Sequence, residues 1–289
     1  MFENFDVREE ASLKDYSTIK IGGKAKWLVF PRNYLELKKI LEIAETGNLK
    51  YFILGNGSNT LFDDDGFDGV VISLKKFNKV KVVGDYVYAG AGINLFALNQ
   101  KLKAQGLSGL EFCYGIPASL GGFVYMNGGC FGHEIGQVVE EVLVLNDGKL
   151  VRLKKEEIEF SYRKTNLQDC VILRVKLRLT PQDVKVIEEN MNFYFNKKRE
   201  AQPCDLPSLG SVFKAVYGEK TVYVSKMIDT LGLKGVKIGG AEISKKHAGF
   251  IVNTGNATSQ DVKDLIELVK RELTKVDVFP ELEIIMLEK

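Results

Sequence analysis

The sequence predicts an α+β protein built from two parts, and three observations support that prediction. Short apolar segments separated by glycine turns recur in the first 180 residues, which is typical of strands and hairpins. Residues 33–46 and 94–105 instead carry apolar side chains at helical spacing. A break at Thr180-Pro181 precedes a helical segment over 182–199, because Thr caps helices well and Pro is favoured at the first helical position.

The remaining elements follow from the same patterns on both sides of the break. In the first part, the sequence predicts strands over 27–30, 51–54, 70–72, 79–83, 86–89, 140–145, 149–153 and 171–179. After the break, it predicts a loop over 203–210, strands over 211–216, 249–253 and 282–287, and helices over 222–231 and 259–275.

Composition narrows the classes of partner. The chain has 289 residues, and 40 Lys and Arg nearly balance 38 Asp and Glu, whereas a general polyanion binder has a stronger basic excess. We therefore expect no nucleic-acid partner, although a small anionic ligand needs only a few local cations or backbone amides. No apolar run approaches the roughly 20 residues of a membrane span, and the N-terminus is acidic where a signal peptide is basic. A cytoplasmic protein without a membrane partner is expected.

The cysteines and histidines give no sign of a metal site. The four cysteines are far apart and form no CxxC pair, which argues against a zinc cluster. Only two histidines are present, so a His-rich site is also not expected. The sequence predicts reduced thiols and no bound metal.

Two glycine-rich loops are the first candidates for ligand binding. The first follows a strand and reads Gly55-Asn56-Gly57-Ser58-Asn59; the second reads Gly115-Ile116-Pro117-Ala118-Ser119, then Gly121-Gly122, then Asn127. Glycines let backbone amides approach a ligand closely, and Ser and Asn add short donors, so the loops can form a nest for phosphate oxygens. The first is no Rossmann fingerprint, since Thr60 holds its sixth position. For one loop alone an ordinary tight turn is an equally good interpretation; the pair favours binding.

A series of motifs then adds a resemblance to a known family. In order along the chain they are Ile21-Gly22-Gly23, Gly55-Asn56-Gly57-Ser58-Asn59, Gly66-Phe67 with Gly69-Val70-Val71-Ile72, Gly115-Ile116-Pro117, Ser161-Tyr162-Arg163, Gln202-Pro203, Gly210-Ser211-Val212-Phe213-Lys214, Lys246-His247-Ala248-Gly249-Phe250-Ile251-Val252-Asn253 and Pro280-Glu281-Leu282-Glu283-Ile284-Ile285. The series covers nearly the whole chain. It resembles the UDP-N-acetylenolpyruvoylglucosamine reductases, also called UDP-N-acetylmuramate dehydrogenases.

The resemblance implies a fold and a reaction. The fold is a vanillyl-alcohol-oxidase-type FAD-binding module of the PCMH type over residues 18–180, followed by a smaller α/β substrate-binding domain over 181–289. The reaction is an NADPH-dependent reduction of the enolpyruvyl group of a UDP-sugar, through non-covalent FAD, in peptidoglycan biosynthesis. The chain resembles the shorter subtype that lacks an extra tyrosine-bearing loop, and a monomer is expected.

Three residues are implied to be catalytic. The reaction adds a hydride to the terminal carbon and a proton to its neighbour, so the protein must bind a carboxylate and supply the proton. Arg163 is expected to bind the carboxylate, since its planar fork suits bidentate contact. Ser211 is expected to donate the proton. Glu281, with Glu283 as its rival, is expected to share a hydrogen bond as charge shifts. Without the motifs, the alternatives are a surface arginine, a Gly-Ser turn and a solvated carboxylate.

The binding residues are implied in the same way. For FAD they are Gly55, Asn56, Gly57, Ser58, Asn59, Gly115, Ile116, Pro117, Ala118, Ser119, Gly121, Gly122 and Asn127. For the substrate they are Tyr162, Gln202 and Lys214, although an exposed charge explains Lys214 nearly as well. The chain departs from the family where Ala215-Val216 replaces the usual Asn-Pro. Two other functions stay open: an FAD oxidase that uses oxygen, and a non-catalytic protein that binds nucleotide sugars.

Overall fold

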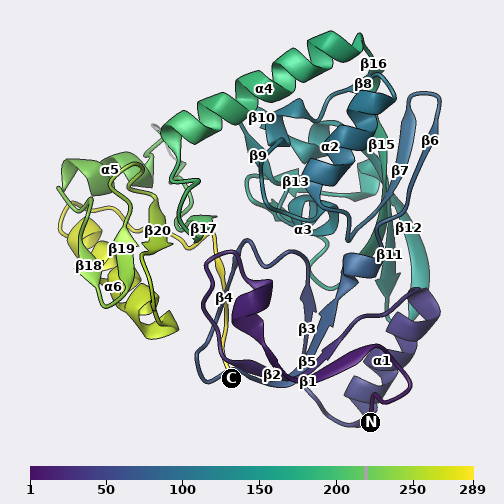
Figure 1. Ribbon diagram of the computed structural model, residues 1–289, viewed down its shortest axis with the longest axis horizontal. Helices are drawn as coiled ribbons and strands as arrows, with labels where there is room; N and C mark the ends of the chain where they lie inside the picture. Colours follow the sequence, from purple (N-terminus) through teal and green to yellow (C-terminus); the bar gives the residue numbers. More distant parts are fainter. Residues whose placement is uncertain (218–220) are drawn as a thin grey trace. The chain divides into compact units, whose positions relative to one another are not determined.

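The computed structural model describes residues 1–217 and 221–289, which form two compact units (Figure 1). The first unit comprises Met1–Glu9, Trp27–Asn56 and Gly69–Lys197. The second comprises Glu10–Lys26, Gly57–Asp68 and Lys198–Lys289. The chain therefore passes between the units several times, and no single cut in the sequence separates them. The domain division predicted after residue 180 stays a prediction.

The first unit is centred on an antiparallel sheet of five strands in the order β12-β11-β15-β7-β6. Their bounds are β6 (Val80–Val83), β7 (Tyr86–Gly90), β11 (Val139–Asn146), β12 (Lys149–Lys154) and β15 (Val171–Arg178). Both predicted hairpins are confirmed, because β6 pairs with β7 and β11 pairs with β12. Gly84 has φ +57° in the first turn, a conformation that glycine adopts without strain.

Two helices supply the core for one face of this sheet. Helix α2 (Leu95–Ala104) and helix α3 (Leu120–Tyr125) bury Leu98 and Val124 in one cluster with Val87, Val142 and Val175 of the strands. Because strand side chains alternate between faces, the intervening residues point to the opposite side. Helix α2 was predicted. Helix α3 was not, since it has fewer than two turns and contains two glycines.

A second core of the first unit lies around helix α1 (Tyr34–Thr46). Its Leu37, Ile40 and Ala44 pack with residues of two parallel strands, β3 (Tyr51–Leu54) and β5 (Phe67–Ser73). The helix begins after Asn33, whose side chain accepts a hydrogen bond from the Glu36 N–H. The complete sheet has the order β1-β2-β5-β3, with β1 (Val7–Ser12) and β2 (Lys24–Val29).

Three further pairs of short strands belong to the first unit, and one corrects a predicted cap. They are β8 (Leu107–Ser108) with β16 (Thr180–Pro181), β9 (Gly129–Cys130) with β10 (His133–Glu134), and β13 (Phe160–Ser161) with β14 (Lys164–Thr165). Thr180 and Pro181 were expected to open the next helix, but their pairing with β8 holds them extended. Helix α4 (Val184–Ala201) begins later, where Asp183 Oδ1 accepts the Lys185 N–H at 2.7 Å.

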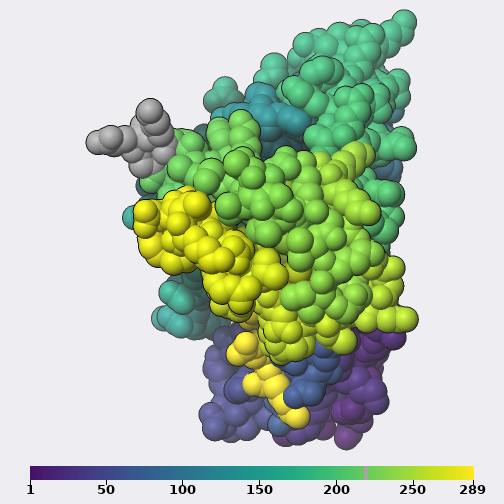
Figure 2. All heavy atoms as spheres, turned by 90° about the vertical axis from the view of Figure 1, so that its left-hand side faces the viewer, coloured from purple at the N-terminus to yellow at the C-terminus, as the bar shows by residue number. Residues whose placement is uncertain are grey.

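The second unit has its own sheet and its own core. Its antiparallel sheet has the order β17-β20-β19-β18, with β17 (Ser208–Ser211), β18 (Lys237–Ile238), β19 (Ala241–Ile243) and β20 (Phe250–Asn253). Helices α5 (Val224–Thr230) and α6 (Ser259–Thr274) pack on one face through residues such as Ile228, Leu265 and Ile266. A parallel pair, β4 (Thr60–Phe62) with β21 (Ile285–Leu287), completes it. The green and yellow surface in Figure 2 is formed by this C-terminal part of the chain.

Two predicted strands of the second unit are placed differently by the structure. The strand expected over 211–216 is β17, which begins at Ser208 and ends at Ser211. The register shifts between Ser208 and Ser211, opposite Val252 and Phe250 of β20, so the strand carries a bulge that alternation alone does not reveal. The last strand is also shorter than 282–287. The predicted helices over 222–231 and 259–275 are confirmed within one or two residues at each end.

We expect Asn253→Ala to destabilise the second unit. Asn253 is buried, its Nδ2 donates to the Ile19 carbonyl at 3.0 Å, and its Oδ1 accepts the N–H groups of Gly255 and Ala257. Truncation leaves these groups without partners, which costs about 2–4 kcal/mol. Urea unfolding monitored by circular dichroism measures the loss. Gln260→Ala, on the exposed side of α6, is the matched control; equal stability of the two variants would contradict the prediction.

Candidate active site

Within the first unit, Gly55 and Asn56 of the first glycine loop contact the second glycine loop. Asn56 Nδ2 donates a hydrogen bond to the Pro117 carbonyl at 2.6 Å, which ties the first loop to the second. A Cβ atom on Gly55 would lie 2.4 Å from Ser119 Oγ, so only glycine allows this approach. Ser119 in turn caps helix α3, because its Oγ accepts the Gly122 N–H at 3.3 Å.

Part of this pair of loops fits a bound phosphate group. Among the described residues of the first unit, the backbone N–H groups of Asn56, Ala118 and Ser119 donate no hydrogen bond. Those of Gly57 and Ser58, in the second unit, also donate none. Backbone N–H groups without a protein partner are matched by water or by a ligand. Successive N–H groups around a glycine at positive φ, as at Gly57 (φ +61°), form an anion-binding concavity. The residues present therefore fit the diphosphate of a dinucleotide such as FAD.

Other glycines of these loops are explained by packing inside the protein. A Cβ on Gly57 would lie 1.9 Å from the Tyr16 carbonyl oxygen, and one on Gly121 would lie 2.7 Å from Ala91 Cβ. Gly115 faces the ring of Phe195 at 2.6 Å in the same way. The Gly121 N–H also donates to the Ala91 carbonyl at 2.7 Å, so it does not point at a ligand. Substituting Gly57 or Gly121 would disturb the fold whether or not FAD contacts them.

Asn127 is fully buried, and its amide joins three segments of the first unit. Its Nδ2 donates to Glu134 Oε2 at 2.9 Å and to the Ser161 carbonyl at 3.0 Å, while its Oδ1 accepts the Gly136 N–H at 3.2 Å. Both amide hydrogens are thus used within the protein. The structure gives Asn127 an internal role, and its predicted contact with FAD stays a prediction.

Arg163 lies in the turn of the β13–β14 hairpin, directly after Tyr162. Its φ is +55°, which is uncommon for a residue with a side chain. Arg163 Nη2 donates to the Gly129 carbonyl at 3.0 Å, and the guanidinium carbon lies 4.9 Å from the centre of the Tyr162 ring. The hairpin is fixed at its base by the Ser161–Asn127 bond and by Thr165 Oγ1, which donates to the Tyr125 carbonyl at 2.8 Å.

The other predicted catalytic residues lie in the second unit. Ser211 ends β17 after its bulge, opposite Phe250. Lys214 and Glu281 are brought together twice, because Lys214 Nζ lies 3.0 Å from Glu281 Oε2 and the Lys214 N–H donates to the Glu281 carbonyl at 2.9 Å. Glu283 donates its backbone N–H to the Val212 carbonyl at 2.8 Å. The chain segment 281–283 thus lies beside the segment 212–214.

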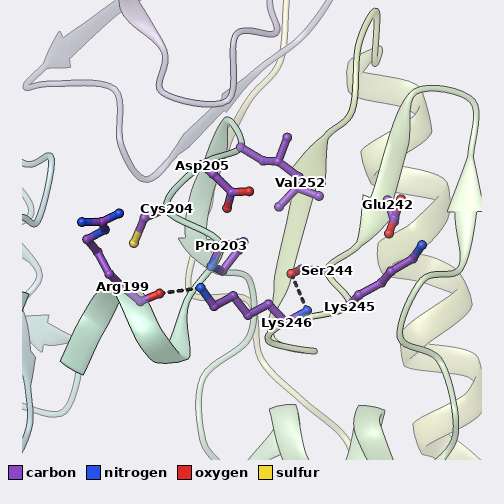
Figure 3. A pocket seen from close by; sticks show the side chains of 10 residues that line it. Arg199, Pro203, Cys204, Asp205, Glu242, Ser244, Lys245, Lys246 and Val252 are labelled. Carbon is purple, nitrogen blue, oxygen red and sulfur yellow. Dashed lines mark hydrogen bonds between the residues drawn. The ribbon is translucent and has the colours of Figure 1, made fainter. Parts of the chain in front are cut away.

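A charged cavity of about 570 Å³ opens in the second unit, and Pro203, the residue after Gln202, is among those that line it (Figure 3). Arg199, Lys245 and Lys246 bring positive charge to it, and Asp205 and Glu242 bring negative charge. Lys246 is held in place, since its Nζ donates to the Arg199 carbonyl and its N–H donates to Ser244 Oγ at 3.1 Å. Sequence patterns alone do not reveal this cavity, although Lys246 begins one of the motifs.

His247 follows these lysines and is half-buried. Its Nδ1 accepts the Gly249 N–H at 3.2 Å, and its ring packs edge-on against Phe250. Burial lowers the pKa of His247 below its ordinary value, so the ring is neutral at neutral pH. Because the His247 ring is neutral, it adds no positive charge to that of Lys245 and Lys246.

Within residues 1–217 and 221–289, no helix is long and apolar enough to span a lipid bilayer. No group of three or more His, Cys, Asp and Glu side chains there is arranged to hold a metal ion.

In comparisons with known proteins, both parts of the chain match a known family. Residues 25–154 match the family model described as FAD binding domain. Residues 202–286 match the model described as UDP-N-acetylenolpyruvoylglucosamine reductase, C-terminal domain. The predicted α+β fold class, an FAD-binding module followed by a distinct C-terminal domain, is thereby confirmed.

Individual relatives agree over most of the chain. The UDP-N-acetylenolpyruvoylglucosamine reductase of Thermotoga petrophila is 43% identical over 263 residues, which cover 90% of this chain and 91% of the relative. The Streptococcus pneumoniae protein of the same name is 39% identical over 272 residues, 93% of this chain and 89% of the relative. The crystal structure of the Thermus caldophilus reductase superposes with a TM-score of 0.86 at 36% identity, over 98% of this chain and 99% of that one. The chain therefore belongs to the UDP-N-acetylenolpyruvoylglucosamine reductase family.

Proposed function

We propose that this chain reduces UDP-N-acetylenolpyruvoylglucosamine to UDP-N-acetylmuramate, and that Arg163, Ser211 and Glu281 serve the reaction. As a member of its family it is an FAD-dependent oxidoreductase that takes its electrons from NADPH. The observation that carries the proposal is the link between Asn56 and Pro117 in the first unit, where the N–H groups of Asn56, Ala118 and Ser119 donate to no described residue. Bound FAD supplies hydride transfer. The protein binds and orients the substrate and moves the proton.

Arg163 is the proposed carboxylate ligand. A guanidinium has five N–H donors, so one side chain can bond a backbone carbonyl and still grip a carboxylate in a fork. The bond to the Gly129 carbonyl and the short β13–β14 hairpin fix the direction of the side chain. A carboxylate held in this way keeps the adjoining enolpyruvyl carbons in one orientation.

Ser211 is the proposed proton donor, and the ion pair in the second unit supports that choice over Glu281. Glu281 accepts a hydrogen bond from Lys214 Nζ at 3.0 Å, so in this conformation its carboxylate acts as an acceptor. We assign Glu281 to electrostatic support of the shifting charge and Lys214 to its positioning. A hydroxyl is a weak acid in water, but the carbon that receives the proton is strongly basic, so the transfer is feasible.

The remaining assignments concern the nucleotide sugar. We assign Tyr162, the neighbour of Arg163 in the sequence, and Gln202, the neighbour of the cavity-lining Pro203, to its binding. The cavity suits an anionic group, since Arg199, Lys245 and Lys246 line it. We further propose that the protein acts as a monomer in the cytoplasm. The two rival functions, an oxidase and a non-catalytic binding protein, lack support from the comparisons, whose named relatives are reductases.

Asn56→Ala is expected to weaken FAD binding about tenfold without unfolding the protein. Asn56 is exposed, and the variant loses the bond to Pro117 that holds the two loops together. Loss of one such hydrogen bond costs about 1 kcal/mol or slightly more. Fluorescence titration of the deflavinated protein measures the change in Kd. Asn78→Ala, an exposed asparagine elsewhere in the first unit, should bind FAD normally. Equal affinities of the two variants would show that the loops do not form the site.

Arg163→Lys is expected to slow reoxidation of the reduced enzyme by substrate about 10–100-fold, because a lysine cannot reproduce a bidentate contact. Reduction of FAD by NADPH should stay close to normal. Stopped-flow absorbance at the flavin band separates the two half-reactions. Lys164→Ala changes the next residue of the same hairpin and should leave both unchanged. If Arg163→Lys slows both half-reactions equally, the side chain serves the structure and not the substrate.

Ser211→Ala is expected to slow the same reoxidation step by about 10²–10⁴-fold, the usual effect of losing a positioned acid. Substrate binding and NADPH oxidation should change little, and Ser211→Cys should recover part of the activity, because a thiol also donates a proton. Ser208→Ala, at the other end of β17, is the control. Single-turnover mixing of reduced enzyme with substrate measures the rate. A wild-type rate for Ser211→Ala would remove Ser211 from the mechanism and make Glu281 or water the donor.

A further inference from the structure

The five-stranded sheet of the first unit has a second face that is only partly covered: Leu145, Val171 and Leu173 at one end of β11 and β15 pack in the α1 core, and the residues described here lie beyond that end. Val87, Val142 and Val175 point toward helices α2 and α3, so their neighbours along each strand point away. The residues of this outer face include six cations, two tyrosines and one carboxylate: Lys81, Arg152, Lys154, Arg174, Lys176, Arg178, Tyr86, Tyr88 and Glu141. We call this set the basic face.

The cations of the basic face are not neutralised by the chain itself. Within the described residues, none of the six forms a salt bridge, whereas lysines elsewhere pair with carboxylates, as Lys263 does with Asp63 and Lys234 with Asp229. Glu141 lies between Lys154 and Lys176 in register and is the single acid among them. Like charges on neighbouring strands repel each other, so a face of this kind gains free energy when an external anion covers it.

The tyrosine rings of this face are already covered by its own cations. Lys176 Nζ lies 4.2 Å from the centre of the Tyr86 ring and 5.9 Å from that of Tyr88. The guanidinium carbons of Arg174 and Arg178 lie 5.7 Å from Tyr88 and 6.0 Å from Tyr86. A platform for single-stranded nucleic acid needs open ring faces on which bases stack. The arrangement therefore presents positive charge and not stacking surfaces.

The spacing of these charges suits a broad anionic surface better than a pocket-sized ligand. Neighbouring strands lie about 4.8 Å apart, so the cations on β6, β15 and β12 are spread over the width of the sheet. At one end of the sheet the β6–β7 turn brings Val83, half exposed, opposite Tyr86 in register and next to Arg178. An apolar side chain and a tyrosine at the edge of a basic surface match the boundary between lipid head groups and water.

We propose that the basic face binds the surface of an anionic lipid bilayer, reversibly and without insertion of any helix. The attraction is electrostatic, with Val83 and Tyr86 adding a small apolar contact, and it weakens as salt rises. This contact lies outside the catalytic assignments above, because none of its residues belongs to them. It departs from the expectation of no membrane partner, which rested on the lack of a long apolar run and on the acidic N-terminus.

The test is co-sedimentation of the FAD-loaded enzyme with vesicles of phosphatidylglycerol and phosphatidylcholine in equal parts. At low salt the wild type should sediment with these vesicles, should not sediment with pure phosphatidylcholine, and should be released as salt is raised. The double variant Lys81→Glu/Arg152→Glu should bind at least tenfold more weakly. Both residues are exposed and lie on the two edge strands, so the substitutions leave the core intact.

The control carries the same change of net charge elsewhere in the first unit. Lys101→Glu/Lys185→Glu alters two exposed lysines of α2 and α4 and should bind vesicles like the wild type. Turnover and unfolding temperature of both variants should match the wild type. The proposal is overturned if the wild type ignores anionic vesicles at low salt, or if both double variants lose binding equally. It is also overturned if a single-stranded oligonucleotide binds the wild type more tightly than the vesicles do.

Discussion

The buried amide of Asn127 is the constraint on which the hairpin that carries Arg163 depends. Its hydrogen bonds reach the carbonyl of Ser161, the N–H of Gly136 and the carboxylate of Glu134. Ser161 begins the two-residue turn that carries Arg163, so the direction of the guanidinium follows from an amide that never needs to touch the substrate. A buried polar group that makes all its hydrogen bonds is rigid, whereas the loss of one bond lowers the stability of the fold. The Asn127 amide therefore supports the hairpin only when all its hydrogen bonds are made.

The same distinction between support and contact applies to the glycines. Gly57 and Gly121 lie in loops that resemble a phosphate nest. Each must nevertheless be glycine for another reason, because a Cβ atom there would clash with Tyr16 or Ala91. What remains for a ligand are backbone N–H groups, at Asn56, Gly57 and Ser58 above all. Glycine in a binding loop thus has two causes that look identical in a sequence, and only the surroundings of each Cα separate them.

The sequence predicted the fold well where local signals were long and regular. Helices α1, α2 and α6 show clear helical spacing, and both hairpins have a glycine in the turn, so all were predicted. Helix α3 was missed because it is short and its first turn contains Gly121 and Gly122. The true bounds of β17 were missed because a bulge before Ser211 breaks the alternation. Motifs predicted the candidate site residues as a set, and that set stays a prediction. They did not reveal the bonds of Asn127 or the Lys214–Glu281 pair, which join segments far apart in the chain.

The distribution of charge over the surface is likewise not visible in the sequence alone. The totals of 40 basic and 38 acidic residues nearly cancel, and cancellation predicts no polyanionic partner. In the folded chain, however, several acids form salt bridges: Asp63 with Lys263, Glu36 with Arg32 and Glu281 with Lys214. Each such pair removes one charge of either sign and leaves the balance unchanged, but on the outer face of the five-stranded sheet Glu141 is the one acid in the set beside six cations. A potential depends on where charges lie, since exposed charges act over about one Debye length, roughly 10 Å at 0.1 M salt. A nearly neutral protein can therefore carry a strongly basic surface.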